Sequence, residues 1–246
     1  MLRRILAGLL LSVAAPWIVG CDLPGRPQAG PEVPRPDEVH SFDALYRQNC
    51  AGCHGADGQQ GSATNLANPI YEAWIDDDSL RRAIAEGEKG SLMPAFALNR
   101  GGTLTASQID VLVRGLRTKW AKPNAFGSTT PPPYRAQAPG VASQGAAVYQ
   151  SACARCHGAT PQQPGAAGSI LDPSFLSLVT AQGLRTTIVA GRPDIGHPDW
   201  RNDIPGHALT DAEVTDVTAW LLSQSSDHPA TGSKSAGLVQ PTVPKQ

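Results

Sequence analysis

Two short stretches of this 246-residue chain repeat the same chemically active side chains at the same spacing. The first is Cys50-Ala51-Gly52-Cys53-His54, and the second is Cys153-Ala154-Arg155-Cys156-His157. Two thiols one helical turn apart can add to the two vinyl groups of one porphyrin, and the histidine that follows can then ligate its iron. The spacing therefore predicts two covalently attached haem c groups, with His54 and His157 as the proximal ligands.

Two other uses of paired cysteines fit this pattern less well. A redox dithiol of the thioredoxin kind needs a βαβ context, and no such pattern surrounds either pair. A four-cysteine zinc site would have to join pairs about 100 residues apart, far outside the spacing of zinc ribbons. Neither use explains why a histidine directly follows the second cysteine in both copies.

The N-terminal residues 1–20 are typical of an export signal. Arg3 and Arg4 precede an apolar run from Ile5 to Val13, which is too short to be a comfortable membrane span. An uncleaved anchor helix is the alternative, but Pro16 and the short run argue against it. Export predicts that the mature chain lies outside the cytoplasmic membrane.

The stretch Ile18-Val19-Gly20-Cys21 resembles the lipobox of bacterial lipoproteins, in which the cysteine becomes lipidated and the signal is cut just before it. The chain has five cysteines, and the four in the C-x-x-C-H motifs leave Cys21 over, so it is predicted to be a lipid anchor. Asp22 resembles the signal that retains enteric lipoproteins at the inner membrane. Residues 21–40 are rich in proline and are predicted to form a semi-rigid tether on the periplasmic side.

The overall composition limits the possible partners. The chain has 20 Lys and Arg against 21 Asp and Glu, and cleavage after Gly20 would remove two basic residues and no acidic one. A net negative mature chain argues against nucleic acid as a partner. Hydrophobic residues make up 41% of the chain and aromatic residues only 5%, as expected if a porphyrin fills much of each core.

The elements around the two motifs form two similar sets. They predict domains at residues 41–122 and 140–224, a Pro-rich linker at 123–139 and a disordered tail at 225–246. Capping signals and apolar periodicity place three helices in each domain. In the first domain, one helix is expected to begin at Ser41, one to cover residues 80–86, and one to begin at Thr105 with a capping box to Gln108. In the second domain, one helix is expected to run through Ala146 and Tyr149, one to cover residues 184–190, and one to begin at Thr210 with a capping box to Glu213.

This organisation resembles two tandem class I cytochrome c domains, because each set of helices encloses one C-x-x-C-H motif. The resemblance implies an all-α fold in each domain, with the N- and C-terminal helices crossing near the haem and loops wrapping the macrocycle. It also implies that the sixth ligand of each iron is a methionine in a Met-Pro pair after the middle helix.

The predicted sixth ligand differs between the two halves. Residues 84–87 align with residues 188–191, and the same offset places Met93-Pro94 on His197-Pro198. Met93 is the only methionine after the initiator, so we expect Met93 on the first iron and His197 on the second. His207, just before the last helix, remains the alternative ligand for the second iron.

The predicted function is that of a membrane-tethered di-haem electron carrier, not an enzyme, which passes single electrons between redox proteins. Thioether sulfur favours ferrous iron and imidazole favours ferric iron, so the second haem is expected at the lower potential. Three alternatives stay open: a cytochrome subunit of a larger respiratory oxidoreductase or oxidase complex, a di-haem enzyme, and a haem-based sensor. A thiosulfate dehydrogenase would need a cysteine ligand, and a sensor would need a sixth ligand that exchanges.

Overall fold

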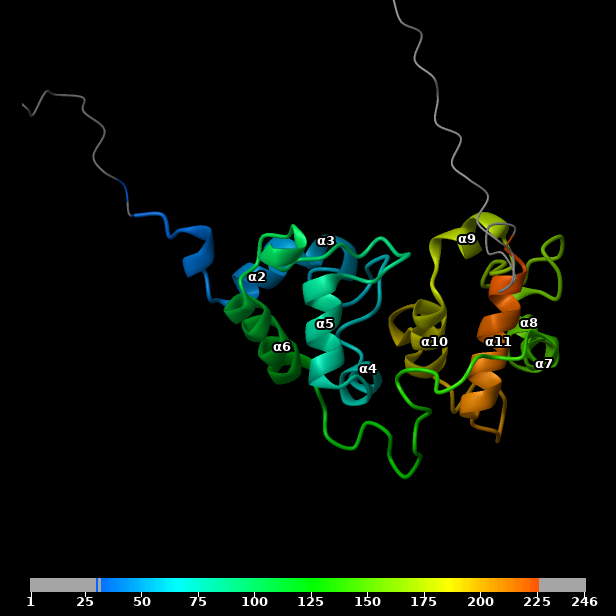
Figure 1. Cartoon of the computed structure of the whole chain (residues 1–246). Coiled ribbons are helices and arrows are strands. Elements are labelled where there is room, and N and C mark those ends of the chain that lie inside the picture. Colours follow the sequence, from blue (N-terminus) through cyan, green and yellow to red (C-terminus); the bar gives the residue numbers. More distant parts are fainter. Residues whose placement is uncertain (1–29, 31, 226–246) are drawn as a thin grey trace, which may run out of the picture. The chain divides into compact units, whose positions relative to one another are not determined.

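The computed structural model describes residue 30 and residues 32–225 (Figure 1). The chain divides into two compact units, Met1–Pro36 and Asp37–Gln246, and both C-x-x-C-H motifs lie in the second. The predicted export signal, the predicted anchor at Cys21 and nearly all of the predicted tail lie outside the described residues. Among the described residues, no helix is both long enough and apolar enough to cross a membrane.

Residues 30 and 32–225 contain helices and a few isolated bridges but no strand, so the predicted all-α fold is confirmed. The elements before the linker are η2 (Pro36–Glu38), α2 (Phe42–Asn49), α3 (Ala51–His54), α4 (Pro69–Trp74), α5 (Asp77–Glu86), η3 (Leu98–Arg100) and α6 (Ala106–Trp120). The elements after it are α7 (Ala142–Val148), the π-helical turn η4 (Tyr149–Cys153), α8 (Ala154–His157), α9 (Pro173–Leu178), α10 (Ala181–Ala190), η5 (Pro193–Ile195) and α11 (Asp211–Ser223).

The predicted helix starts are confirmed where a capping signal marked them. The Ser41 side chain accepts from the backbone N–H of Ala44, and reciprocal capping boxes open α6 at Thr105 and α11 at Thr210. The middle helices begin three residues earlier than predicted, because Asp76 and Thr180 cap α5 and α10.

The short helices α4 and α9 were not predicted. Each has a side-chain cap followed directly by proline, Asn68-Pro69 in α4 and Asp172-Pro173 in α9. Proline suits the first position of a helix, because the N–H that it lacks would have no partner there. The pattern was present in the sequence, but six residues are too few to show helical periodicity.

The first and last helices of each half pack against each other. In the first half, Leu45 of α2 and Leu112 of α6 are each 1% exposed, and the Trp120 ring stands edge-on to Phe42 and Tyr46. In the second half, α7 packs on α11, and the rings of Tyr149 and Trp220 lie 4.7 Å apart. These contacts give each half the terminal-helix pairing that the resemblance implies.

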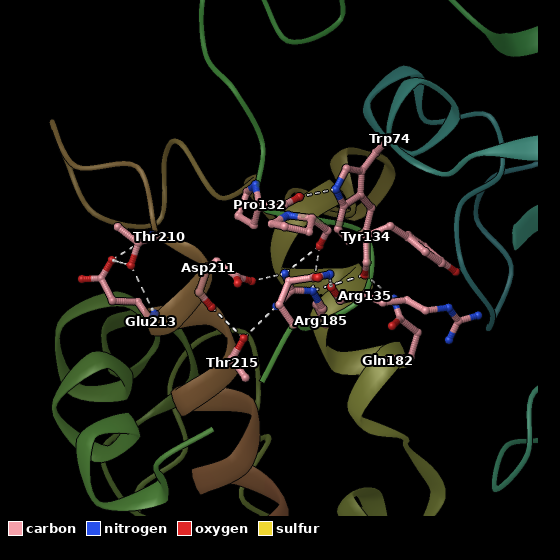
Figure 2. Close-up of polar contacts among 12 residues, drawn as sticks. Trp74, Pro132, Tyr134, Arg135, Gln182, Arg185, Thr210, Asp211, Glu213 and Thr215 are labelled. Carbon is pink, nitrogen blue, oxygen red and sulfur yellow. Dashed lines mark hydrogen bonds and ion pairs between the residues drawn. The ribbon is translucent and has the colours of Figure 1, made fainter. Parts of the chain in front are cut away.

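The linker at 123–139 is bound along its middle by side chains from both halves (Figure 2). Trp74 of α4 donates from Nε1 to the carbonyl of Pro132 at 2.6 Å, and its ring meets Tyr134 edge-on at 5.0 Å. Arg185 of α10 donates to the carbonyls of Pro133 and Tyr134. The linker is therefore a packed part of the larger unit, which a proline-rich sequence does not reveal.

Candidate haem sites

His54, the first predicted proximal histidine, ends helix α3, and its Nδ1 lies 2.8 Å from the carbonyl oxygen of Thr64. A carbonyl can only accept, so Nδ1 carries the proton and Nε2 keeps a free lone pair for a metal. Burial lowers the pKa of His54, and the nearby charge of Arg192 lowers it further, against the Thr64 hydrogen bond, which raises it. Both the tautomer and the charge state therefore suit iron ligation.

His157, the second predicted proximal histidine, is held in the same way at the end of α8. Its Nδ1 lies 3.0 Å from the carbonyl of Gly168, which again leaves Nε2 free. A tyrosine fixes the turn after each histidine. The hydroxyl of Tyr46 donates to the Gly55 carbonyl at 2.7 Å, and that of Tyr149 donates to the Gly158 carbonyl at 2.7 Å. The two motifs are therefore built to one plan.

The two cysteines of each motif have different surroundings. Cys50 and Cys153 are partly buried, whereas Cys53 and Cys156 are exposed. Burial is the largest cause that raises the pKa of Cys50 and of Cys153 to about 12. These positions favour an uncharged sulfur, such as a thioether, over the thiolate that a zinc site would need.

The loops that carry Met93 and His197 share two backbone features. Each follows a glycine with a φ of 70°, Gly87 after α5 and Gly191 after α10, and at this φ other residues are strained. The N–H of Glu88 donates to the carbonyl of Met93 at 3.1 Å, and the N–H of Arg192 donates to that of His197 at 3.1 Å. The hydrogen bond that closes each loop therefore follows the offset predicted from the sequence.

The imidazole of His197 faces that of His157. Their ring centroids are 6.0 Å apart, and the rings are inclined by 39°. A metal ion held by one nitrogen of each ring, with bonds of about 2 Å, would need a separation of about this size. The Nδ1 of His197 lies 2.8 Å from the carbonyl of Pro198, so its Nε2 is free as well. Burial is the main cause that lowers the pKa of His197, which favours the neutral ligand.

His207, the alternative sixth ligand, is bonded elsewhere. Its Nε2 lies 2.9 and 3.0 Å from the two carboxylate oxygens of Glu213, and its side chain is 47% exposed. Glu213 also completes the capping box of α11, so the contact ties His207 to the start of that helix. The arrangement favours His197 over His207.

Two features of the second half have no signal in the sequence. Asp203 is 8% exposed, and burial, with the charge of Asp199, raises its pKa to about 7. Its charge in turn raises the pKa of Cys153, which places this carboxyl near the second attachment site. The other is an ion pair between Arg192 and Asp194, which contacts the loop after the first motif. Both occur in loops rich in small and polar residues, where such side chains usually face water.

Comparisons with known proteins find both halves in one family. The family model described as cytochrome c oxidase, cbb3-type, subunit III matches residues 37–114 and again residues 140–221. The cbb3-type cytochrome c oxidase subunit CcoP of Azospirillum sp. (strain B510) is 30% identical over 140 residues, which are 51% of this chain and 41% of that protein. This chain therefore matches less than half of that relative's length.

Among solved structures, a chain of the Kuenenia stuttgartiensis reducing HAO-like protein complex matches with a TM-score of 0.43 and 18% identity. The match covers 79% of this chain and 99% of that one. Cytochrome c domains imply covalently bound haem c, and two domains with two cysteine pairs fit two such groups. The doubled family match, which covers more than half of the sequence, shows that this protein belongs to the family of cbb3-type cytochrome c oxidase subunit III and consists of two tandem cytochrome c domains.

Proposed function

We propose that this protein is the di-haem electron-transfer subunit of a membrane-bound oxidoreductase complex, with one His/Met site and one bis-histidine site. The observation that carries the proposal is the pair of equivalent sites, in which each proximal histidine is fixed through Nδ1 to a carbonyl of its own loop. Haem, when bound, supplies an iron that accepts and releases one electron. The protein's contribution is to fix the ligands and set the order of the two potentials.

The proposed ligands set that order. His54 and Met93 would hold the first iron, and His157 and His197 the second. Thioether sulfur at Met93 favours the ferrous state, and imidazole at His197 favours the ferric state. Each ~59 mV between two one-electron sites biases the resting place of an electron tenfold. Electrons that enter at the His157/His197 site would therefore run downhill to the His54/Met93 site.

Family membership favours a role in a complex over that of a freely diffusing carrier. The named relative is an oxidase subunit, and the family model that matches both halves describes an oxidase subunit as well. The filled coordination proposed at the second site also argues against catalysis or sensing there. An iron with two axial histidines has no free position for a substrate or a signalling ligand. We infer that the donors and acceptors are redox proteins, one of them a neighbour in the same complex.

Purified protein is expected to titrate in two one-electron steps, with one bis-imidazole and one imidazole–thioether signature. Met93→Ala should abolish the weak near-infrared sulfur-to-iron band and let carbon monoxide bind at the first site. The reason is that alanine supplies no sixth ligand. Optical and EPR spectra during a redox titration test both statements. A wild-type spectrum without the band, or a band that survives in Met93→Ala, would refute the His/Met assignment.

The proposed anchor is a lipid on Cys21, at the periplasmic face of the inner membrane. Cys21→Ser is expected to leave the protein unlipidated, so that more of it is released from membranes by a salt wash. Two or more acyl chains hold a protein firmly, whereas one chain binds only marginally. Intact mass and membrane fractionation measure the difference. If Cys21→Ser is processed, located and weighed like the wild type, the anchor assignment is wrong.

A further inference from the structure

An ion pair with little exposure to solvent joins the two haem domains. Arg192 directly precedes η5 and Asp194 lies within it, in the loop that leads to His197. The two side chains bond to each other at 2.9 and 2.8 Å. Arg192 also donates to the carbonyls of Ala63 at 3.1 Å and Gly61 at 3.0 Å. Asp194 accepts from the backbone N–H of Gln60 at 2.9 Å. All three of these partners belong to the loop after the first C-x-x-C-H motif.

Each of the joined loops is hydrogen-bonded to a proposed axial histidine. In the first domain, the residue after Ala63 is Thr64, whose carbonyl accepts from Nδ1 of His54. In the second domain, Arg192 and His197 exchange two backbone hydrogen bonds, of 3.1 and 3.0 Å. The side chain of Arg192 therefore bonds one residue from the carbonyl that orients His54, while its backbone bonds to His197 itself.

The contact has little exposure to solvent and more than one attachment. The Arg192 side chain is 14% exposed and that of Asp194 is 1% exposed, so water competes little for their bonds. Beside them, the amide of Asn68, which is 2% exposed, donates to the carbonyls of Ala190 at 2.7 Å and Gly191 at 3.2 Å. The guanidinium of Arg192 lies against the loop that orients His54, and its backbone bonds to His197, so its positive charge lies beside both sites.

We propose that Arg192 and Asp194 are positioning residues for electron transfer between the two haem sites. They fix the loop of the first proximal histidine against the loop of the second distal histidine, so the electron crosses between the domains at this contact. The positive charge of Arg192 acts on both sites at once and favours the reduced state of each. This inference rests on the proposed function, since it takes His54 and His197 as iron ligands.

The chain offers a matched control in a second arginine–aspartate pair. Arg201 bonds to Asp199 at 2.9 and 2.7 Å, in nearly the same fork geometry, and its Nη1 donates to the carbonyl of Phe126 in the linker. Arg201 follows His197 by four residues, so Arg201→Gln removes a charge near the second site. It leaves the contact with the 60–64 loop in place.

The test compares holoprotein of the wild type, Arg192→Gln, Arg192→Lys and Arg201→Gln. Redox titration gives both midpoint potentials, flash reduction by a photoexcited flavin gives the rate of transfer between the haems, and hydrogen exchange at the Gln60 amide reports the contact itself. Arg192→Gln should lower the reduction equilibrium constant of both sites by about threefold to thirtyfold. It should also slow transfer between the haems at least threefold and speed exchange at Gln60.

The other variants separate charge from position. Arg192→Lys keeps the charge but not the planar fork, so it should slow transfer while leaving both midpoints nearly unchanged. Arg201→Gln should move at most the second midpoint and leave both the transfer rate and Gln60 unchanged. If Arg192→Gln shifts only one midpoint, or leaves the transfer rate unchanged although Gln60 exchanges faster, the inference is overturned. A wild type without a bis-imidazole signature would instead refute the proposed function, which the spectra show before any variant is made.

Discussion

Replacement of His197 by methionine is expected to raise the lower of the two midpoint potentials and to leave the upper one nearly unchanged. The rise should be on the order of 0.1–0.2 V, within the range of about 0.8 V over which axial ligands tune haem. Thioether sulfur stabilises ferrous iron, whereas the imidazole that it replaces stabilises ferric iron. The first site should feel only a screened change, because its own proposed ligands, His54 and Met93, are untouched.

The loop that carries His197 can be expected to accept a methionine at this position. Its loop has the same backbone hydrogen bond and the same preceding glycine conformation as the loop of Met93. Methionine at 197 would therefore occupy a loop of the kind that presents Met93 in the first domain. Its unbranched, flexible side chain can adapt to the space that the imidazole leaves.

Two further variants show whether the right histidine has been identified. His197→Ala should give a high-spin iron that binds carbon monoxide at the second site, because no other imidazole faces His157 in the described structure. His207→Ala should change neither spectrum nor potential and should cost less than about 1 kcal/mol, since its pair with Glu213 is solvent-exposed. If His207→Ala perturbs the low-potential haem and His197→Ala does not, the assignment of the sixth ligand is wrong.

Much of each candidate site could be predicted because its parts are local in sequence. A C-x-x-C-H motif places three functional groups on a little more than one helical turn, and the repeat offset carries Met93 onto His197. The helix starts could be predicted for the same reason, since the side chains of Ser41, Thr105 and Thr210 each accept from the backbone N–H three residues later. Short-range chemistry of this kind leaves a residue pattern that sequence alone retains.

The contacts between the domains could not be predicted, because their partners are backbone carbonyls. Any residue can supply a carbonyl, so nothing in Gly61, Ala63 or Pro133 marks it as the acceptor of an arginine more than 50 residues away. From sequence alone, Arg192-Pro193-Asp194 is typical of a local turn. The proline-rich stretch at 123–139 predicts a connection, but not the two side chains that hold it in place.

The side chain that holds this stretch most firmly is Arg185, and its replacement by methionine is expected to have the largest effect on stability. Arg185 is 2% exposed and lies between the linker and α11, as Figure 2 shows. It donates to the carbonyls of Pro133 and Tyr134, to the hydroxyl of Thr215 at 3.0 Å and to the carboxylate of Asp211. One guanidinium therefore serves four acceptors from two segments.

Methionine fills a similar volume but donates nothing, so the buried acceptors would lose their partner. Breaking a buried ion pair from one side costs about 3–5 kcal/mol. The Asp211 side chain is 35% exposed and can turn to water, so the lower end, roughly 3 kcal/mol, is expected. For a chain of this size each kcal/mol lowers the melting temperature by about 2–4 °C, which gives a fall of roughly 10 °C.

Release of the linker provides a second readout that does not depend on complete unfolding. Arg135, beside Tyr134, is an exposed trypsin site in a segment whose neighbours are held by Arg185 and Trp74. Arg185→Met should raise the rate of cleavage after Arg135 at least tenfold, because proteolysis follows the population of the open form. Arg82→Met, at an exposed position of α5, is the matched control and should change neither the melting temperature nor the cleavage rate. Melting within about 2 °C of the wild type, together with unchanged cleavage, would show that Arg185 does not hold the linker against the second half of the chain.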